Sequence, residues 1–135
     1  MKAAGILETV LYAERLAEMR DFYERVLGLD VVQADLDRHL FFRCGDQMLL
    51  VFDPRLTRAQ AGDHAPPPHG AAGAGHVCFR ADADALDGWR SHLERHDVAI
   101  ETEFAWPRGG RSIYFRDPAG NSVEIAEPRI WGLDR

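Results

Sequence analysis

The chain has 135 residues, enough for one compact domain and too few for two ordinary ones. Its net charge of −6 disfavours a nucleic-acid partner, which would require clustered positive charge. No stretch approaches the ~18 apolar residues of a membrane span, so no membrane partner is expected. Cys44 and Cys78 have no CxxC spacing and fit a reducing compartment, so we expect a cytoplasmic protein.

The first half of the chain predicts the element order βαβββ. Residues 6–13 alternate as a strand, with Glu8 on the face of Ile6 and Val10. Apolar residues then recur at helical spacing until Gly28, which is typical of a helix end. The expected elements are a strand over 6–13, a helix over 16–27, a strand over 29–34 and a hairpin over 39–53 that turns at Gly45 and Asp46.

The second half repeats this order after a linker. Residues 54–75 carry four prolines and four glycines without apolar periodicity. The expected elements that follow are a strand over 76–81, a helix marked by Leu86, Trp89 and Leu93, a strand over 98–104 and two strands, 111–116 and 122–127, around the turn "DPAGN". We therefore expect a single α+β domain of two tandem modules, about 5–53 and 76–128.

The two halves align residue by residue. "LFFR" at 40–43 matches "IYFR" at 113–116, and "LLVFDP" at 49–54 matches "VEIAEP" at 123–128. In this alignment Glu8 corresponds to His76, and Glu124 corresponds to Leu50. Three of the four equivalent positions thus hold side chains that can bind a metal.

Glu124 is the most informative of these residues. It interrupts an apolar strand, and a buried carboxylate costs several kcal/mol unless it is paired, protonated or bound to a cation. If the two modules form one curved sheet, Glu8, His76 and Glu124 project into its concave side and form a candidate set for a divalent metal ion. Mn²⁺, Fe²⁺, Ni²⁺, Co²⁺ and Zn²⁺ are not distinguished by these ligands.

Three segments resemble the glyoxalase/bleomycin resistance/dioxygenase family, the vicinal oxygen chelate superfamily. They are "VLYAERLAEMRDFYERVLGLDV", "GHVCFRA" and "GRSIYFRDPAGNSVEIAEP", and the resemblance spans residues 5–128. It implies the glyoxalase-like fold, in which two βαβββ modules form a curved mixed sheet with helices on its convex side. It also implies metal ligands on the first and last strands of the modules, which here are Glu8, His76 and Glu124.

The resemblance does not select a single reaction. Leu50 cannot bind a metal, so the set differs from the four ligands of glyoxalase I and is more similar to the three of extradiol dioxygenases or fosfomycin-modifying transferases. The only lysine is Lys2, whereas those transferases use a lysine to bind substrate. Lyase, isomerase, dioxygenase and transferase chemistry all stay open, with Glu8 and Glu124 as candidate catalytic carboxylates.

Other residues are candidates for substrate binding. Ser112 and Tyr114 share a strand face beside Glu124, and their first-module counterparts are His39 and Phe41. The candidates are therefore Tyr114, Ser112, His39, Phe41, Trp106 and Arg111. A second interpretation stays open for each: the first four pack as ordinary strand residues, and "AWPRGGR" is a flexible loop. Glu8 can equally be a wet strand start and His76 a histidine bonded to backbone.

We expect a divalent-metal enzyme that acts on a small oxygen-chelating substrate. The alternative is a metal-free protein of the bleomycin-resistance type, which binds a flat or cationic molecule in an acidic, aromatic groove. By resemblance, chains of this length form homodimers.

Overall fold

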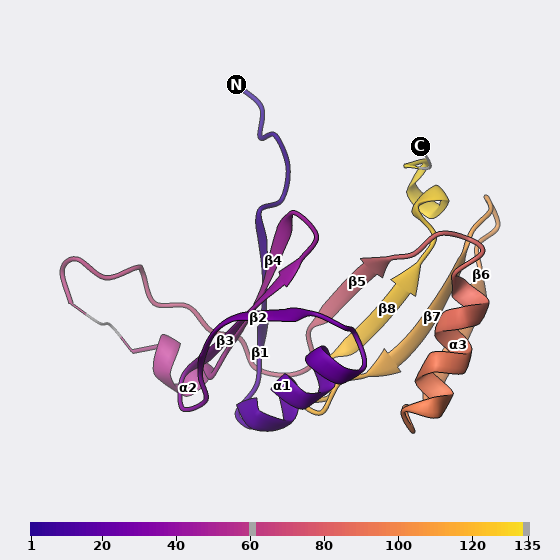
Figure 1. The fold of residues 1–135 in the computed structure, drawn as a ribbon. Coiled ribbons are helices and arrows are strands. Elements are labelled where there is room, and N and C mark those ends of the chain that lie inside the picture. Colours follow the sequence, from indigo (N-terminus) through magenta and orange to yellow (C-terminus); the bar gives the residue numbers. More distant parts are fainter. Residues whose placement is uncertain (60–61, 134–135) are drawn as a thin grey trace. The chain divides into compact units, whose positions relative to one another are not determined.

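The computed structural model describes residues 1–59 and 62–133. The chain divides into two compact units, Met1–Gly73 (unit 1) and Ala74–Arg135 (unit 2), and the boundary falls within the linker expected at 54–75. Each unit contains one four-stranded sheet and one long helix (Figure 1). The expected α+β fold of two βαβββ modules is confirmed.

Unit 1 has the strand order β1-β4-β3-β2. The outer strand β1 runs parallel to β4, and the other pairs are antiparallel. Its elements are β1 (Glu8–Tyr12), α1 (Leu16–Arg25), β2 (Asp30–Asp35), β3 (His39–Cys44), β4 (Gln47–Phe52) and the short helix α2 (Pro54–Thr57).

Unit 2 repeats this topology as β5-β8-β7-β6, again with one parallel pair, β5 with β8. Its elements are β5 (His76–Arg80), α3 (Leu86–Arg95), β6 (Ile100–Ala105), β7 (Arg111–Arg116), β8 (Ser122–Ala126) and the 3-10 helix η1 (Pro128–Trp131). In Figure 1, α3 runs along one face of this sheet.

Strand alternation gives each sheet one packed face. In unit 1 the packed face buries Leu40, Phe42 and Val51, and α1 contributes Met19 and Tyr23, which are fully buried. In unit 2 the corresponding residues are Ile113, Phe115, Val123, Ile125 and, from α3, Leu93. Burial of these side chains is the main stabilising term, at about 25 cal/mol per Å² of apolar surface.

The structure adds two short elements to the expected ones. Asp53 caps α2, since its Oδ1 accepts a hydrogen bond from the Arg55 N–H at 2.9 Å. This helical turn stands where a structureless linker was expected, because four residues are too few for apolar periodicity. The turn η1 begins at Pro128, directly after the expected end of the last strand. It is followed by Gly132 in the left-handed conformation, with φ 65°.

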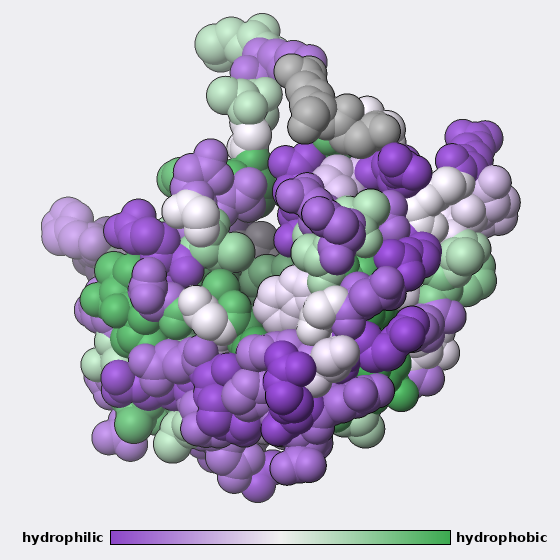
Figure 2. Space-filling model, turned by 45° about the vertical axis from the view of Figure 1, so that its right-hand side comes forward, coloured by the Kyte–Doolittle hydropathy of each residue, from purple (hydrophilic) through white to green (hydrophobic). Residues whose placement is uncertain are grey.

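The structure confirms the internal alignment through strand register. Glu8 pairs with Met48 as His76 pairs with Ser122, so Leu50 and Glu124 lie at equivalent places. The candidate site residues that lie on strands, except Arg111, are on the face opposite the packed one, which we call the open face. Polar residues dominate the molecular face drawn in Figure 2. Among the described residues, no helix is long and apolar enough to cross a membrane.

Candidate functional site

Glu124 lies in the centre of the open face of the unit 2 sheet. It is 5% exposed and lies on β8 between Cys78 of β5 and Tyr114 of β7, its partners in the strand register. Residues two apart on a strand share a face, so His76 and Ser112 project from the same side. The site is thus made by three neighbouring strands of one unit.

The imidazole of His76 meets the carboxylate of Glu124. His76 Nε2 lies 3.2 Å from Glu124 Oε2, and His76 Nδ1 lies 3.0 Å from the carbonyl oxygen of Ser122. Because a carbonyl oxygen only accepts hydrogen bonds, Nδ1 carries a proton, and the Nε2 of a neutral imidazole then presents a lone pair. This lone pair and the carboxylate oxygen repel each other unless a proton or a metal ion lies between them.

The turn before β8 fixes the start of β5, where His76 lies. Asn121 Oδ1 accepts a hydrogen bond from Gly75 N–H at 2.7 Å. Asn121 Nδ2 donates to Asp117 Oδ2 at 2.9 Å, and Asp117 Oδ1 accepts from the N–H groups of Ala119 and Asn121. Asp117 and Asn121 are 4% and 2% exposed, so their side-chain atoms are largely shielded from competing water. The turn "DPAGN" therefore holds the backbone beside His76.

Glu124 perturbs two neighbouring acids. Desolvation, together with the Tyr114 O–H donating to Glu124 Oε1 at 2.9 Å, raises the pKa of Tyr114 to about 12. Desolvation and then the Glu124 charge raise the pKa of Cys78 to about 12. Both groups stay protonated at neutral pH. Cys78 is therefore a poor nucleophile, and Tyr114 acts as a hydrogen-bond donor.

Trp106 and Ser112 extend the polar face beyond Tyr114. Trp106 Nε1–H donates to Ser112 Oγ at 2.8 Å, and Ser112 is 1% exposed. The neighbouring Ser112 hydroxyl acts to lower the pKa of Tyr114, but desolvation and Glu124 outweigh it. The structure thus brings together Ser112, Tyr114 and Trp106 with Glu124.

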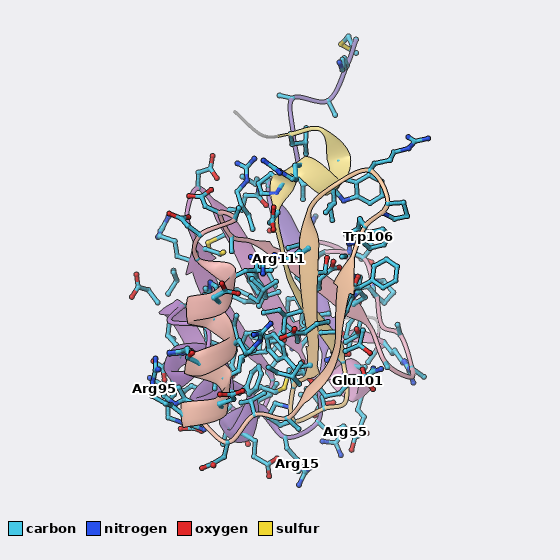
Figure 3. The ribbon with its side chains drawn as sticks, turned by 90° about the vertical axis from the view of Figure 1, so that its right-hand side faces the viewer. Arg15, Arg55, Arg95, Glu101, Trp106 and Arg111 are labelled. Atoms are coloured by element: carbon cyan, nitrogen blue, oxygen red, sulfur yellow. The ribbon has the colours of Figure 1, made fainter. Side chains whose placement is uncertain are left out.

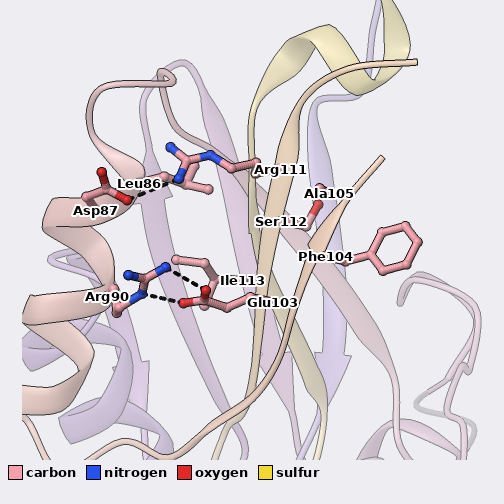
Figure 4. A pocket seen from close by; sticks show the side chains of 9 residues that line it. All are labelled: Leu86, Asp87, Arg90, Glu103, Phe104, Ala105, Arg111, Ser112 and Ile113. Atoms are coloured by element: carbon pink, nitrogen blue, oxygen red, sulfur yellow. Dashed lines mark hydrogen bonds and ion pairs between the residues drawn. The ribbon is translucent and has the colours of Figure 1, made fainter. Parts of the chain in front are cut away.

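Arg111 lies on the other face of β7. Its guanidinium donates to Asp87 Oδ1 at 3.1 Å, to Glu127 Oε1 at 3.2 Å and to the carbonyl oxygen of Ala83. Figure 4 shows Arg111 reaching toward α3 while Phe104 points away from it, and Figure 3 labels Arg111 and Trp106 in the same part of unit 2. The structure therefore does not bring Arg111 together with Glu124, and its role in substrate binding stays a prediction.

A cavity of about 240 Å³ lies beside Arg111, between α3 and strands β6 and β7. It is separate from the His76–Glu124 pair. Arg90 Nε and Nη2 bind both oxygens of Glu103 at 2.5 and 2.6 Å, as the dashed lines in Figure 4 show. The two arginines that line the cavity, Arg90 and Arg111, are thus each paired with a carboxylate. Neither offers an unpaired positive charge to an anion.

In unit 1, Glu8 begins β1 and is exposed. It occupies the place of His76 in the repeat, and Leu50, which is 8% exposed, occupies the place of Glu124. Unit 1 thus offers one oxygen ligand where unit 2 offers a paired imidazole and carboxylate. The role of Glu8 as a metal ligand stays a prediction.

An aromatic cluster covers the other end of this unit 1 face. His39 stacks on Phe41 with centroids 4.5 Å apart, and Phe52 lies 5.4 Å from Phe41 and 4.9 Å from His69. The Tyr12 hydroxyl is hydrogen-bonded to His69 Nδ1 at 2.7 Å. His39 Nε2 is buried and has no hydrogen-bond partner in the described part of the chain. The structure therefore joins His39 and Phe41 in one surface with three further rings.

The donor set of unit 2 suits a borderline divalent cation, since imidazole and carboxylate both bind such ions. Within residues 1–59 and 62–133, no three His, Cys, Asp or Glu side chains are gathered as a metal site. His76 and Glu124 would hold the ion, because their facing Nε2 and Oε2 atoms need either a proton or a metal ion between them. Any further ligand of such an ion would have to come from outside the His76–Glu124 pair.

The sequence pattern did not reveal the roles of Asn121 and His69. The hydrogen bond from Gly75 to Asn121 joins residues 46 apart, and His69 lies in a loop with no periodic signal. The turn signal "DPAGN" could have drawn attention to Asn121, because Asp and Asn side chains bond turn backbone. No sequence signal identifies His69.

Comparison with known proteins gives consistent matches. The profile of the Glyoxalase/Bleomycin resistance protein/Dioxygenase superfamily matches residues 5–125. The solved structure of lactoylglutathione lyase from Agrobacterium tumefaciens is 42% identical, with a TM-score of 0.94 and coverage of 98% of this chain and 99% of that chain.

Two more distant structures share the fold alone. A glyoxalase/bleomycin resistance protein/dioxygenase from Nocardioides is 20% identical, with a TM-score of 0.74 and coverage of 94% of this chain and 85% of that one. The fosfomycin resistance protein FosX from Listeria monocytogenes is 18% identical, with a TM-score of 0.69 and coverage of 92% and 91%.

Proposed function

The chain belongs to the Glyoxalase/Bleomycin resistance protein/Dioxygenase superfamily, and from this premise we propose that it is a divalent-metal-dependent enzyme acting on a small oxygen-chelating substrate. The observation that carries the proposal is the 3.2 Å approach of His76 Nε2 to Glu124 Oε2. A proton alone could satisfy this pair. A cation uses the same two lone pairs and also offsets the cost of burying Glu124.

Lyase chemistry is the reaction class that the comparisons favour. The lactoylglutathione lyase from Agrobacterium tumefaciens is similar over nearly the whole of both chains. Against a four-ligand site stands Leu50, which is buried at the fourth equivalent position and cannot bind a metal. We propose Glu8 as the third ligand, on its place in the repeat.

When bound, the metal ion would polarise a substrate oxygen and stabilise the negative charge that develops beside it. The chain's own residues would do the rest. Glu8 and Glu124 are the carboxylates that we propose as acceptors of a substrate proton. The O–H of Tyr114 donates to Oε1 of Glu124, so Glu124 would accept a proton at Oε2, and only when that oxygen is not bound to the ion.

Substrate binding is proposed for both open faces. Tyr114, Ser112 and Trp106 are the proposed substrate-binding residues of the unit 2 face, and His39 and Phe41 are those of the unit 1 face. Arg111 would contribute only after exchanging one of its carboxylate partners for an anionic group. A cytoplasmic homodimer completes the proposal, and sedimentation equilibrium of the purified protein tests the dimer.

Metal content of the wild type and two variants tests the proposal. Glu124→Ala removes the buried carboxylate, and Glu103→Ala removes a carboxylate on the packed side of the same unit. After reconstitution with Mn²⁺, Fe²⁺, Co²⁺, Ni²⁺ or Zn²⁺ and dialysis, mass spectrometry should find about one ion per chain in the wild type and in Glu103→Ala. Glu124→Ala should retain far less. No ion in the wild type under any condition contradicts the metal proposal.

The aromatic cluster supports a second candidate function, metal-free binding of a flat molecule. Aromatic rings that remain partly exposed on one face are typical of ligand-binding surfaces. This candidate predicts that planar compounds bind with the same affinity before and after a chelator is added. Phe41→Ala should weaken that binding, whereas Glu124→Ala should not.

A further inference from the structure

Two exposed aromatic side chains lie beside each other at the edge of the open face of unit 2. Phe104, on the outer strand β6, is 45% exposed, and Trp106 is 37% exposed. Their ring centroids are 4.9 Å apart with 75° between the ring planes, so the two rings form a corner, which we call the aromatic corner. Phe104 pairs with Ser112 in the strand register and points away from α3 in Figure 4. The aromatic corner therefore lies on the same face of the sheet as Glu124.

The internal repeat shows that the fold does not require an aromatic residue at this place. Asp35 of β2 pairs with His39 as Phe104 pairs with Ser112, so Asp35 is the unit 1 equivalent of Phe104. Outer strands commonly carry charged residues, because an exposed apolar edge invites association. Unit 1 follows this pattern, and unit 2 departs from it. The topology thus leaves the exposed Phe104 unexplained, and a ligand on this surface would explain it.

Trp106 is held in place before any ligand binds. Its Nε1–H donates to Ser112 Oγ at 2.8 Å, and Ser112 is 1% exposed. Its backbone closes a tight turn with Gly109 and Gly110 through two hydrogen bonds of 2.9 Å. Gly110 has a φ of 90°, and a Cβ at this position would lie 2.6 Å from Ile130 Cγ2, so η1 packs closely against the turn. A ring that is already fixed loses little conformational entropy when it binds a ligand.

The aromatic corner offers a ligand hydrocarbon surface instead of hydrogen bonds. The only polar atom of the Trp106 indole is already bonded to Ser112, and Phe104 has no polar side-chain atom. Two rings at 75° can hold a third ring, because one can stack on it and the other can meet it edge to face. The carboxylates of β6 are each paired with an arginine, so a cationic group would find no unpaired charge there. The chemistry favours an uncharged apolar group, and above all an aromatic ring.

The strand register gives the distance between the aromatic corner and the His76–Glu124 pair. Glu124 pairs with Tyr114, Tyr114 pairs with Thr102, and Phe104 lies two residues further along β6. With about 4.8 Å between strands and about 3.4 Å per residue along a strand, Phe104 lies about 12 Å from Glu124. This distance is longer than an oxygen-chelating group alone. A ligand that contacts both places therefore has a polar head and an apolar tail.

We propose that Phe104 and Trp106 determine substrate specificity by binding an uncharged aromatic or aliphatic tail of the substrate. The oxygen-bearing head of the same molecule lies at His76 and Glu124. The substrate class is thus a molecule with a chelating group at one end and an apolar group about 12 Å away. The position of the head rests on the proposed function, whereas the aromatic corner rests on the geometry and exposure of its two rings.

Two hydroxamates test the two-part ligand by calorimetry, in protein reconstituted with the divalent ion that it retains. Acetohydroxamate has only the chelating head, and 6-phenylhexanohydroxamate adds an uncharged aromatic tail. In the wild type the tail should lower the Kd about 10-fold or more, because it buries apolar surface against two rings. Phe104→Asp gives β6 the residue that unit 1 has at this place and should remove most of this gain. Trp131→Ala, which removes a 78% exposed ring elsewhere in unit 2, should preserve it. An equal gain in the wild type and Phe104→Asp overturns the proposal.

Nuclear magnetic resonance of metal-free protein tests the aromatic corner without the head. The indole N–H signals of the three tryptophans are assigned with Trp89→Phe, Trp106→Phe and Trp131→Phe. The probe is 4-phenylbutanol, which has the tail and no chelating group. It should shift the Trp106 signal in a saturable way and leave the other two signals in place, and Phe104→Asp should raise the concentration needed about 10-fold. The absence of a saturable shift of Trp106 in the wild type overturns the aromatic corner.

The two experiments separate the aromatic corner from the proposed function. If the wild type binds no divalent ion, the proposed function fails, and the 4-phenylbutanol titration still decides whether the corner binds an apolar group. If the wild type binds an ion and acetohydroxamate but gains nothing from the tail, the proposed function stands and the aromatic corner fails. If Phe104→Asp dissociates a wild-type dimer in sedimentation equilibrium while Trp106 does not respond to 4-phenylbutanol, the two rings form an interface between copies, and the proposal is overturned.

Discussion

The two oxygens of Glu124 have different chemical roles. Oε1 accepts from the Tyr114 hydroxyl, whereas Oε2 faces the ring of His76. The first contact is satisfied in every protonation state of the histidine. The second contact needs a proton or a metal ion between the two atoms, so it is the place where the site would take a cation.

The thiol of Cys78 reports the charge of Glu124. Its pKa is raised to about 12, first by desolvation and then by Glu124. Glu124→Gln removes the negative charge that disfavours a thiolate, so the pKa should fall, while desolvation keeps it above the ordinary value. The pH dependence of alkylation in a Cys44→Ala background measures this. An unchanged or higher pKa of Cys78 in the variant would contradict a contribution of the Glu124 charge.

The turn between β7 and β8 holds the start of β5, where His76 lies, in addition to the pairing of the strands. Strand pairing places His76 beside Ser122, but the Asn121 side chain ties the residue before His76 to the turn. This bond adds to the one from the Ser122 N–H to Gly75 O at 2.9 Å and so limits fraying of the strand start. This turn is therefore both a connection and a support for the site.

Asn121→Ala should destabilise unit 2 by about 1–3 kcal/mol, because it leaves the Gly75 N–H and an oxygen of Asp117 without their buried partner. Urea unfolding measures the loss. Ala119→Ser, at an exposed position of the same turn, should change stability by less than about 0.5 kcal/mol. Equal effects of the two changes would mean that the side-chain network is not responsible.

The cap of α2 makes stability depend on pH. The side-chain hydrogen bonds from Arg55 hold the pKa of Asp53 below its usual value, although desolvation opposes them. The charged form thus stabilises the fold above the unfolded pKa of about 3.9, and this contribution is lost as the pH falls through the lower folded value. Asp53→Asn keeps an acceptor for the cap and removes the charge.

Urea unfolding of both proteins between about pH 7 and pH 2 tests this cap. The wild type should be more stable at pH 7, and the difference should shrink only in the acid range. The effect should be modest, because the Arg55 side chain is 61% exposed. A difference that is constant over the whole range contradicts a role for the charge.

Across the whole chain, one topology serves two kinds of surface. Unit 2 buries Glu124 where unit 1 buries Leu50, and it has Tyr114 where unit 1 has Phe41. The open face of unit 2 thus carries polar side chains such as Glu124 and Tyr114, whereas the open face of unit 1 carries aromatic ones such as Phe41. Duplication with divergence of a few side chains on one face is enough to produce this difference.

The parts that could be predicted from sequence are those with local signals. Apolar spacing around Met19 and the turn at Gly45 predict α1 and the β3–β4 hairpin, and the carboxylate in "SVEIAE" marks Glu124. The hydrogen bond of Trp106 to Ser112 and the packing of His69 on Phe52 depend on how loops return to the sheets. Loop paths carry no periodic signal, so these contacts could not be predicted.

Metal binding should raise the stability of the folded chain. An ion that binds only the folded state adds about 2.7 kcal/mol at a free concentration of about 100 times its Kd, and thermal unfolding with and without Mn²⁺ or Ni²⁺ measures the shift. The net charge of −6 attracts cations to the surface without a specific site. Glu124→Gln is therefore the necessary comparison, because it should remove most of the shift and leave surface binding intact.

Ca²⁺, which prefers oxygen ligands over imidazole, should stabilise the wild type less. An equal shift in wild type and Glu124→Gln would place the ion on the acidic surface instead of at His76.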